Sequence, residues 1–222
     1  GADITVIEKN ERPARKLMIT GKGRCNVCNN CDIDTLIANV PENGRFLYSA
    51  FSGFAPQDTM TFFESLGVSL KTERGNRVFP VSDKASDIVD ALVKAAKRGG
   101  AEIIQGTAKK ILTENGAVSG VLLENGEALP ADSVILATGG MSYPLTGSTG
   151  DGYKIARALG HTVTEIKPSL VALNAHEGFC ERLAGLSLKN VALSVFEEGR
   201  KKPVFSELGE ILFTHFGISG PL

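Results

Sequence analysis

The chain consists of short apolar runs that end at glycine-rich segments, and this alternation limits how it can fold. Glycine supplies 25 of the 222 residues, about 11% against a usual share of about 7%. The glycines cluster at 21–23, 139–140, 147–152 and 217–220. Glycine is favoured where backbone turns tightly or approaches a ligand closely. No apolar run approaches the roughly 18 residues of a membrane-spanning helix, so the pattern indicates a globular protein with glycine-lined turns or binding loops.

Charge and composition exclude several classes of protein. The 24 basic and 25 acidic residues give a formal net charge of −1, which excludes a strongly basic binder of nucleic acid or anionic membranes. Hydrophobic residues make up 42% and charged residues 22%, close to globular averages, so global disorder is excluded. The first eight residues form a strand pattern rather than a secretory signal. We therefore expect a cytoplasmic protein without nucleic-acid or membrane partners, and its oligomeric state is unknown.

Local patterns predict an α/β sheet in the first part of the chain. Residues 3–8 are β-branched and apolar and predict a buried parallel strand ending in Glu8. Residues 9–33 are glycine-rich and basic without a clear period, which predicts a long functional loop. Residues 83–98 carry apolar side chains at helical spacing and predict a helix capped by Ser82 and ended by Gly99–Gly100.

Further elements follow from turn residues and short apolar runs. We predict short helices within 43–66 that stop at Gly67, a hairpin of 68–71 and 77–81, strands at 101–105, 107–113, 116–123 and 134–138, and a helix at 151–159. After Pro168 the residues alternate between polar and apolar at 188–196, 203–206 and 210–214, which indicates antiparallel β structure. We therefore place a domain boundary near Pro168.

Ligand-type residues stand where the predicted strands end. In α/β sheets ligands bind beyond the carboxyl ends of the strands, and those ends are Glu8, Thr107 and Thr138-Gly139-Gly140. An acid that ends the second strand of a dinucleotide-binding unit hydrogen-bonds ribose hydroxyls. The glycine fingerprint should lie about 20 residues earlier, but only seven residues precede Glu8. Either Glu8 is a solvated surface acid or, as we expect, the chain is an internal fragment of a longer protein.

Motifs in order along the chain carry a family resemblance. They are Ile7-Glu8-Lys9-Asn10, Arg15-Lys16-Leu17-Met18-Ile19-Thr20-Gly21-Lys22-Gly23-Arg24-Cys25-Asn26, Ala137-Thr138-Gly139-Gly140, Gly147-Ser-Thr-Gly-Asp-Gly152 and Leu212-Phe-Thr-His-Phe-Gly-Ile-Ser-Gly-Pro221. Together they resemble the BaiN/YhiN-type family of NAD(P)/FAD-dependent oxidoreductases, to which aminoacetone oxidase is similar. The resemblance covers essentially the whole chain.

The resemblance implies an enzyme that works through a flavin. It implies an incomplete Rossmann-like FAD-binding domain at 1–167, lacking its glycine-fingerprint strand, and the start of an inserted, mainly β substrate domain at 168–222. The implied cofactor is FAD, with NAD(P)H as a possible reductant. The implied reaction moves hydride or electrons between NAD(P)H or an amine-type donor and a small organic acceptor or oxygen. The catalytic residues are unknown, because the reactive atom belongs to the cofactor.

The resemblance also assigns residues to the cofactor. Glu8 would accept from ribose, Lys16 and Arg24 would offset phosphate charge, Thr107 and Ala108 would meet the adenine, and Asp151 would open a helix facing the cofactor. The assigned residues are Glu8, Lys9, Lys16, Thr20, Gly21, Gly23, Arg24, Cys25, Asn26, Thr107, Ala108, Thr138, Gly139, Gly140, Gly150 and Asp151. The alternatives are a basic surface loop for Lys16–Asn26, an ordinary strand crossover at Thr107 and a helix cap at Asp151. For His215 we favour a packed or hydrogen-bonded histidine over one that binds substrate or moves a proton.

Three cysteines leave a second hypothesis open. Cys25, Cys28 and Cys31 form a C-x-x-C-x-x-C run, but the fourth ligand of an iron–sulfur or zinc site is absent at the expected spacing. We therefore favour free thiols and predict no metal. Because Lys22 and Arg24 would lower the pKa of neighbouring thiols, a non-catalytic flavin- or nucleotide-binding redox sensor using these three cysteines is the alternative function.

Overall fold

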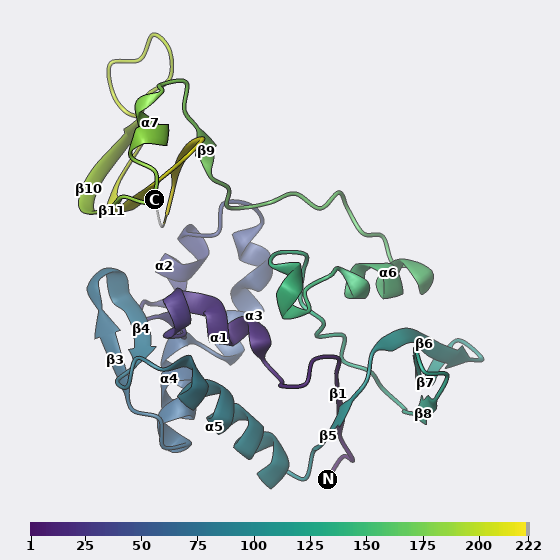
Figure 1. Cartoon of the computed structure of the whole chain (residues 1–222). Helices are drawn as coiled ribbons and strands as arrows, with labels where there is room; N and C mark the ends of the chain where they lie inside the picture. Colours follow the sequence, from purple (N-terminus) through teal and green to yellow (C-terminus); the bar gives the residue numbers. More distant parts are fainter. Residues whose placement is uncertain (221–222) are drawn as a thin grey trace. The chain divides into compact units, whose positions relative to one another are not determined.

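The chain divides into two compact units. The computed structural model describes residues 1–220, so Pro221 of the motif at 212–221 lies outside the described residues. The units are Gly1–Val163 and Thr164–Leu222. Helices and both parallel and antiparallel sheets are present, which confirms the mixed α/β class (Figure 1). The functional division at Pro168 stays a prediction. Within residues 1–220, no helix combines the length and apolarity needed to cross a bilayer.

Two parallel strands place their carboxyl ends side by side. β1 (Thr5–Glu8) pairs with β5 (Glu102–Gln105), with Glu8 opposite Gln105. The predicted parallel strand is therefore confirmed. Its predicted burial is wrong, because Ile4 is 49% and Val6 38% exposed. Among the described residues this sheet contains two strands only, so no further strand of residues 1–220 pairs with the other side of β1.

The segment after β1 is more ordered than a loop. It contains α1 (Arg15–Ile19), the 3-10 helix η1 (Thr20–Gly23), β2 (Cys28–Asn29) and α2 (Ile33–Ala38). Its apolar residues show no period because the backbone reverses repeatedly, with positive φ at Gly21, Lys22, Gly23 and Cys25. Leu17, Met18, Cys25 and Val27 reach the core from different turns of this backbone. The segment predicted as a long loop therefore contains short helices and a strand.

The predicted short helices and hairpin are confirmed. They are η2 (Gly44–Leu47), α3 (Tyr48–Gly53) and α4 (Pro56–Ser65), followed by β3 (Leu70–Glu73), the turn η3 (Arg74–Asn76) and β4 (Arg77–Pro80). The start of α4 is set by Pro56 and by Asp58, whose Oδ2 accepts from the Ala55 N–H at 2.7 Å. β2, β4 and β3 form an antiparallel sheet in that order.

The core of the first unit lies against α5 (Ala85–Arg98). Ala85 and Ile88 on this helix are buried together with Cys25 and Phe63. The predicted helix and its end at Gly99 are confirmed, but the predicted cap at Ser82 is wrong. The N-cap residue is Lys84, without a side-chain cap. Asp83 has a φ of 56°, so the chain turns once more before the helix begins.

An antiparallel meander and a glycine-rich segment follow β5. The meander comprises β6 (Ala108–Glu114), β7 (Ala117–Leu123) and β8 (Ala128–Pro130), paired in that order. The strand predicted at 134–138 is wrong: these residues have no strand pairing, and Ile135 is 92% exposed. Within residues 1–220, no neighbouring strand accepts it. The chain continues through η4 (Pro144–Thr146) into α6 (Asp151–Ala158), which confirms the predicted helix.

The second unit is a small antiparallel sheet with one short helix. It contains β9 (Leu173–Asn174), α7 (Phe179–Arg182), β10 (Ser187–Val195), β11 (Phe205–Thr214) and β12 (Gly217–Ser219), with the strand order β10-β11-β12-β9. The predicted antiparallel structure is confirmed. The strands predicted at 203–206 and 210–214 fall on one strand, β11, which begins at Phe205, because the pairing with β10 continues across 207–209.

Candidate functional site

The carboxyl end of β1 carries an acid with one oxygen available. Glu8 Oε1 accepts from the backbone N–H of Asn10 at 2.9 Å and from Asn10 Nδ2 at 2.8 Å. The same Nδ2 donates to the carbonyl of Thr146 at 3.2 Å. Oε2 accepts no hydrogen bond from the described residues. The side chain is thus oriented through one oxygen, and the other can accept from a ligand.

Lys9 and Asp151, both predicted cofactor residues, are bound to each other. Lys9 Nζ donates to Asp151 Oδ2 at 2.8 Å and to Thr149 Oγ1 at 2.7 Å, and Thr149 Oγ1 donates to the same Oδ2 at 2.7 Å. These hydrogen bonds, that from Lys9 first, lower the pKa of Asp151 to about 2. The N-cap of α6 is Gly150, so the alternative of Asp151 as a helix cap is wrong. Lys9 and Asp151 anchor the start of α6 to the end of β1.

The glycines of 139–152 let this segment fold tightly on itself. Gly150 N–H donates to the carbonyl of Gly140 at 3.1 Å. A Cβ on Gly150 would lie 2.9 Å from Met141 Cγ, and one on Gly152 would overlap Thr138 Oγ1. A Cβ on Gly147 would lie 2.8 Å from Asn10 Nδ2. The close approaches that require glycine are therefore made by the chain itself, and they bring Thr138–Gly140 to Gly150–Asp151.

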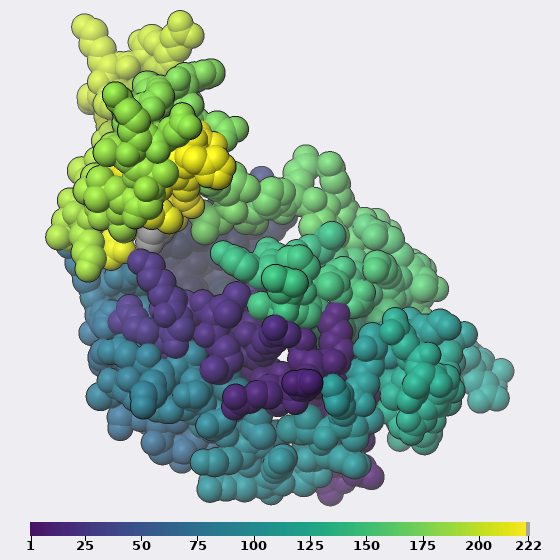
Figure 2. All heavy atoms as spheres, in the orientation of Figure 1, coloured from purple at the N-terminus to yellow at the C-terminus, as the bar shows by residue number. Residues whose placement is uncertain are grey.

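Lys16 connects the basic motif to the same glycine-rich segment. Its Nζ donates to the carbonyl of Ser142 at 2.5 Å and lies 5.2 Å from the centre of the Tyr143 ring. Figure 2 shows these two stretches in contact on one face of the first unit, the early residues in purple and those near 140 in green. Tyr143 has a φ of 54° and is 68% exposed. Its contact with Lys16 was not predicted, because no local pattern links positions so far apart.

The later residues of the basic motif are held by the β3–β4 hairpin. Arg24 Nη1 donates to Glu73 Oε1 at 3.0 Å, Glu73 Oε2 at 3.2 Å and Asp83 Oδ1 at 3.2 Å. A Cβ on Gly21 would lie 2.9 Å from Phe79 Cε1 and from the Asn26 nitrogen. Arg24 therefore already has partners for its charge. This arrangement differs from the alternative of a solvated basic loop, and the contact of Arg24 with phosphate stays a prediction.

The cysteines lack the electrostatics of reactive thiols. Cys25 is 1% exposed within the core, and burial raises its pKa. Burial, the larger cause, and neighbouring charge also raise the pKa of Cys28 and Cys31. Sensor thiols need a lowered pKa, and the Arg24 charge that was expected to lower it is taken up by acids. Residues 1–220 contain no group of three His, Cys, Asp or Glu side chains able to hold a metal ion.

Three other candidate residues, Thr107, Ala108 and His215, lie apart from the contacts between β1 and α6. The carbonyl of Thr107 accepts from Glu124 N–H at 2.9 Å, and Ala108 pairs with Leu123. Both residues therefore start the meander, and their contact with adenine stays a prediction. His215 is exposed in the turn between β11 and β12, with its ring edge-on to that of Phe216 at 5.0 Å.

A pocket of about 510 Å³ lies at the ends of β1 and β5. Lys9, Asn10, Arg12, Arg15 and Gln105 contribute to its lining. Its place agrees with the rule that ligands bind beyond the carboxyl ends of parallel strands. Sequence reasoning did not select Arg12 or Arg15, although Arg15 begins the basic motif. Their charge suits a phosphate-bearing ligand.

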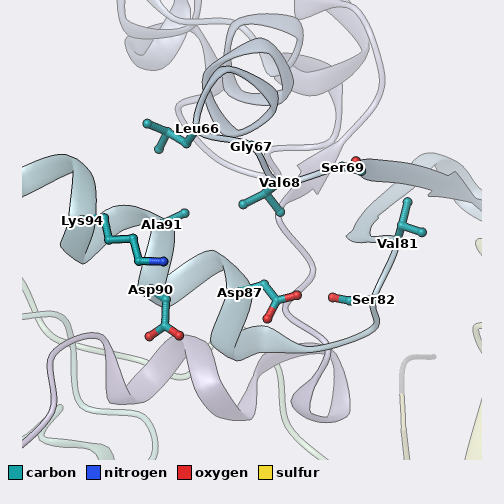
Figure 3. Close-up of a pocket in the computed structure, with 10 residues that line it drawn as sticks. All are labelled: Leu66, Gly67, Val68, Ser69, Val81, Ser82, Asp87, Asp90, Ala91 and Lys94. Carbon is teal, nitrogen blue, oxygen red and sulfur yellow. The ribbon is translucent and has the colours of Figure 1, made fainter.

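A second pocket has a similar volume but a different setting. It measures about 490 Å³ and lies between α5 and the connection from α4 to β3. Asp87, Asp90 and Lys94 of α5 stand on one side, facing Leu66 and Val68 on the other (Figure 3). It contains none of the predicted cofactor residues, and it lies beside the antiparallel strands β3 and β4 rather than at the carboxyl ends of the parallel pair. We therefore take the pocket beside Lys9 and Asn10 as the candidate cofactor site.

Comparison with known proteins identifies the family to which the chain belongs. Residues 1–220 match the family model described as HI0933-like protein Rossmann domain. The chain is 33% identical to the 3-dehydro-bile acid delta(4,6)-reductase of Clostridium scindens, covering 99% of this chain and 52% of the relative. It is 30% identical to the ribosomal RNA dihydrouridine synthase of Escherichia coli, covering 100% and 53%. The chain spans about half the length of these curated relatives. The family resemblance predicted from the motifs is thus confirmed, and the chain belongs to the HI0933-like protein family through its Rossmann domain.

Proposed function

We propose that this chain forms much of the FAD-binding part of a flavin-dependent oxidoreductase that saturates a carbon–carbon double bond. Both relatives are named for such a change, one as a delta(4,6)-reductase and the other as a dihydrouridine synthase. A double bond made electron-poor by a conjugated carbonyl is the acceptor that fits both names. FAD, when bound, supplies the hydride chemistry.

The observation that carries the proposal is the free oxygen of Glu8 beside a basic pocket. Glu8 ends a parallel strand, and only Oε1 is used by Asn10. Oε2 can therefore accept from the ribose hydroxyls of the cofactor. Arg12 and Arg15 line the adjoining pocket and can offset phosphate charge. The acid, the cations and the strand ends fit an adenine dinucleotide.

The other residues would keep the site in shape. Lys9 and Asp151 tie α6 to β1, and Asn10 ties Glu8 to the backbone of Thr146. These contacts orient the acid before the cofactor binds, which lowers the entropic cost of binding. NAD(P)H is the proposed reductant. The acceptor class includes both small molecules and a uridine in RNA, since a net charge of −1 excludes only a strongly basic binder.

The test is the visible spectrum of the purified protein at its full natural length. We expect a flavin spectrum that bleaches under nitrogen with NADH or NADPH and returns on addition of a conjugated enone or of uridine-containing RNA. A folded, colourless protein that takes up no added FAD would overturn the proposal. If oxygen restores the oxidised flavin spectrum but neither acceptor does, FAD binding would be supported and the double-bond reaction refuted.

A further inference from the structure

We propose that Arg24 is a positioning residue that holds Thr20–Asn26 in its cofactor-binding conformation through Glu73 and Asp83. This inference rests on the proposed function and takes the assignment of Thr20–Asn26 to the cofactor from the family resemblance. It differs from the expectation drawn from the sequence, in which Arg24 binds phosphate directly. In this proposal, the arginine acts on the cofactor only through the backbone that it holds.

The first support is a closed network of four charges. Arg24 Nη1 contacts both oxygens of Glu73, at 3.0 and 3.2 Å, and Asp83 Oδ1 at 3.2 Å. Lys71 Nζ completes the network, at 2.7 Å from Asp83 Oδ2 and 3.4 Å from Glu73 Oε1. Two cations face two carboxylates. The network therefore has no net positive charge with which to attract a phosphate.

The second support is the ring beneath the guanidinium. The Arg24 guanidinium carbon lies 4.0 Å from the centre of the Phe79 ring, a distance at which the cation is attracted to the ring face. Phe79 is 2% exposed, so the ring is firmly packed. The same ring meets the position where Gly21 would carry a Cβ. One buried side chain of β4 thus contacts the segment at two points, Gly21 and Arg24.

The third support is the backbone that this hairpin has to hold. Gly21, Lys22 and Cys25 have φ values of 56°, 58° and 62°. The left-handed conformation is unfavourable for a residue with a Cβ, and it persists only where the surroundings enforce it. Contacts from Glu73, Asp83 and Phe79 supply that constraint. Without them we expect Thr20–Asn26 to relax to other conformations and the cofactor to bind more weakly.

The experiment compares FAD dissociation constants of variants of the full-length protein. Arg24→Ala and the double variant Glu73→Gln/Asp83→Asn are each expected to weaken FAD binding by about tenfold. The triple variant should be no weaker than either, because all three act as one unit. If Arg24 bound phosphate directly, removing the two acids would leave FAD affinity unchanged or increase it, and that result would overturn the inference.

A charge exchange provides the decisive rescue. Arg24→Glu combined with Glu73→Arg keeps two cations and two carboxylates but loses the cation over the Phe79 ring, so it should recover part of the affinity lost in Arg24→Glu alone. A phosphate ligand would not be rescued by this exchange. Arg98→Ala, at the exposed end of α5, serves as the control for loss of one arginine. If the double variant fails to fold, the exchange decides the question. Failure of the wild-type protein to bind FAD refutes the proposed function instead.

Discussion

At the scale of single residues, Glu8 offers the sharpest test of the cofactor site. Its Oε1 is used by Asn10, and its Oε2 has no partner among the described residues. Glu8→Ala should weaken FAD binding by roughly 10- to 100-fold, the equivalent of about 1.5–3 kcal/mol for hydrogen bonds to a charged acceptor. The measurement is a titration followed by flavin fluorescence.

Glu102→Ala is the matched control for that titration. Glu102 is an exposed acid in the same two-stranded sheet, but it begins β5, whereas Glu8 ends β1. The two acids therefore lie at opposite ends of the parallel strands. We expect its FAD affinity to equal that of the unchanged protein. Equal affinity in the Glu8 variant as well would remove Glu8 from the site.

A second residue-scale prediction concerns Gly152, the buried glycine in the first turn of α6. An added Cβ would overlap Thr138 Oγ1, so Gly152→Ala should lower the free energy of unfolding by about 1–3 kcal/mol through overpacking. Gly53→Ala is the control, because a Cβ there meets nothing within 4 Å. Urea denaturation measures both. A Gly152 variant as stable as the Gly53 variant would show that the two segments do not pack as described.

At the scale of elements, the sequence predicted what local patterns determine. The helix at 83–98 shows its apolar face in the spacing of Ala85, Ile88 and Val89, and all three are buried. The 114–116 turn was also predictable, since Asn115 and Gly116 adopt the positive φ that such hairpins require. The absence of a strand at 134–138 was not predictable, because an apolar run becomes a strand only when a neighbouring strand pairs with it.

The candidate site was predictable in part, for the same reason. The sequence predicted Lys9, Gly150 and Asp151 as cofactor residues, and the structure brings them together at the end of β1. It did not reveal that Lys9 and Asp151 pair with each other, 142 residues apart in the chain. Nor did it reveal the partners of Arg24, which lie 49 and 59 residues away. A charged residue in a motif suggests ligand binding, but the sequence does not show whether folding pairs it with an opposite charge in the chain itself.

The link between β1 and α6 should make stability depend on pH. The hydrogen bond from Lys9 lowers the pKa of Asp151 to about 2, below its ordinary value. A depressed carboxylate pKa contributes stability above the unfolded-state value, and the contribution is lost as pH falls toward the folded-state value. Asp151→Asn should therefore destabilise the protein at pH 6, and its difference from the unchanged protein should shrink between about pH 4 and pH 2.

The measurement is urea denaturation at a series of pH values, with Asp90→Asn as the control. Asp90 pairs with Arg12 at 4.0 Å in an ion pair whose side chains are 55% and 75% exposed. Such exposed pairs contribute about 0–1 kcal/mol, so this variant should follow the unchanged protein closely. An Asp151→Asn difference that stays constant down to pH 2 would contradict the assigned pairing.

At the scale of the whole molecule, the two units should unfold separately. The buried apolar side chains of Thr164–Leu222 are few, Cys180 and Ile211 among the described residues, so this unit should unfold at lower urea concentration. All three tyrosines, Tyr48, Tyr143 and Tyr153, belong to Gly1–Val163, and the chain has no tryptophan. Tyrosine fluorescence therefore reports on the first unit alone, whereas far-UV circular dichroism reports on both.

We expect the circular dichroism signal to begin changing at a lower urea concentration than the fluorescence. The earlier change should match loss of strand rather than helix, since the second unit is mainly β10 and β11. Superimposable transitions from the two probes would show that the chain unfolds as one cooperative body.

The charge network of Arg24, Glu73 and Asp83 has a consequence for sequence variation among related proteins. A descendant that lost the acid at 73 would leave a guanidinium without its closest partner, against the ring of Phe79. Selection would then favour a compensating change at 24 or 83. Across related chains, we therefore expect these positions to vary together or not at all.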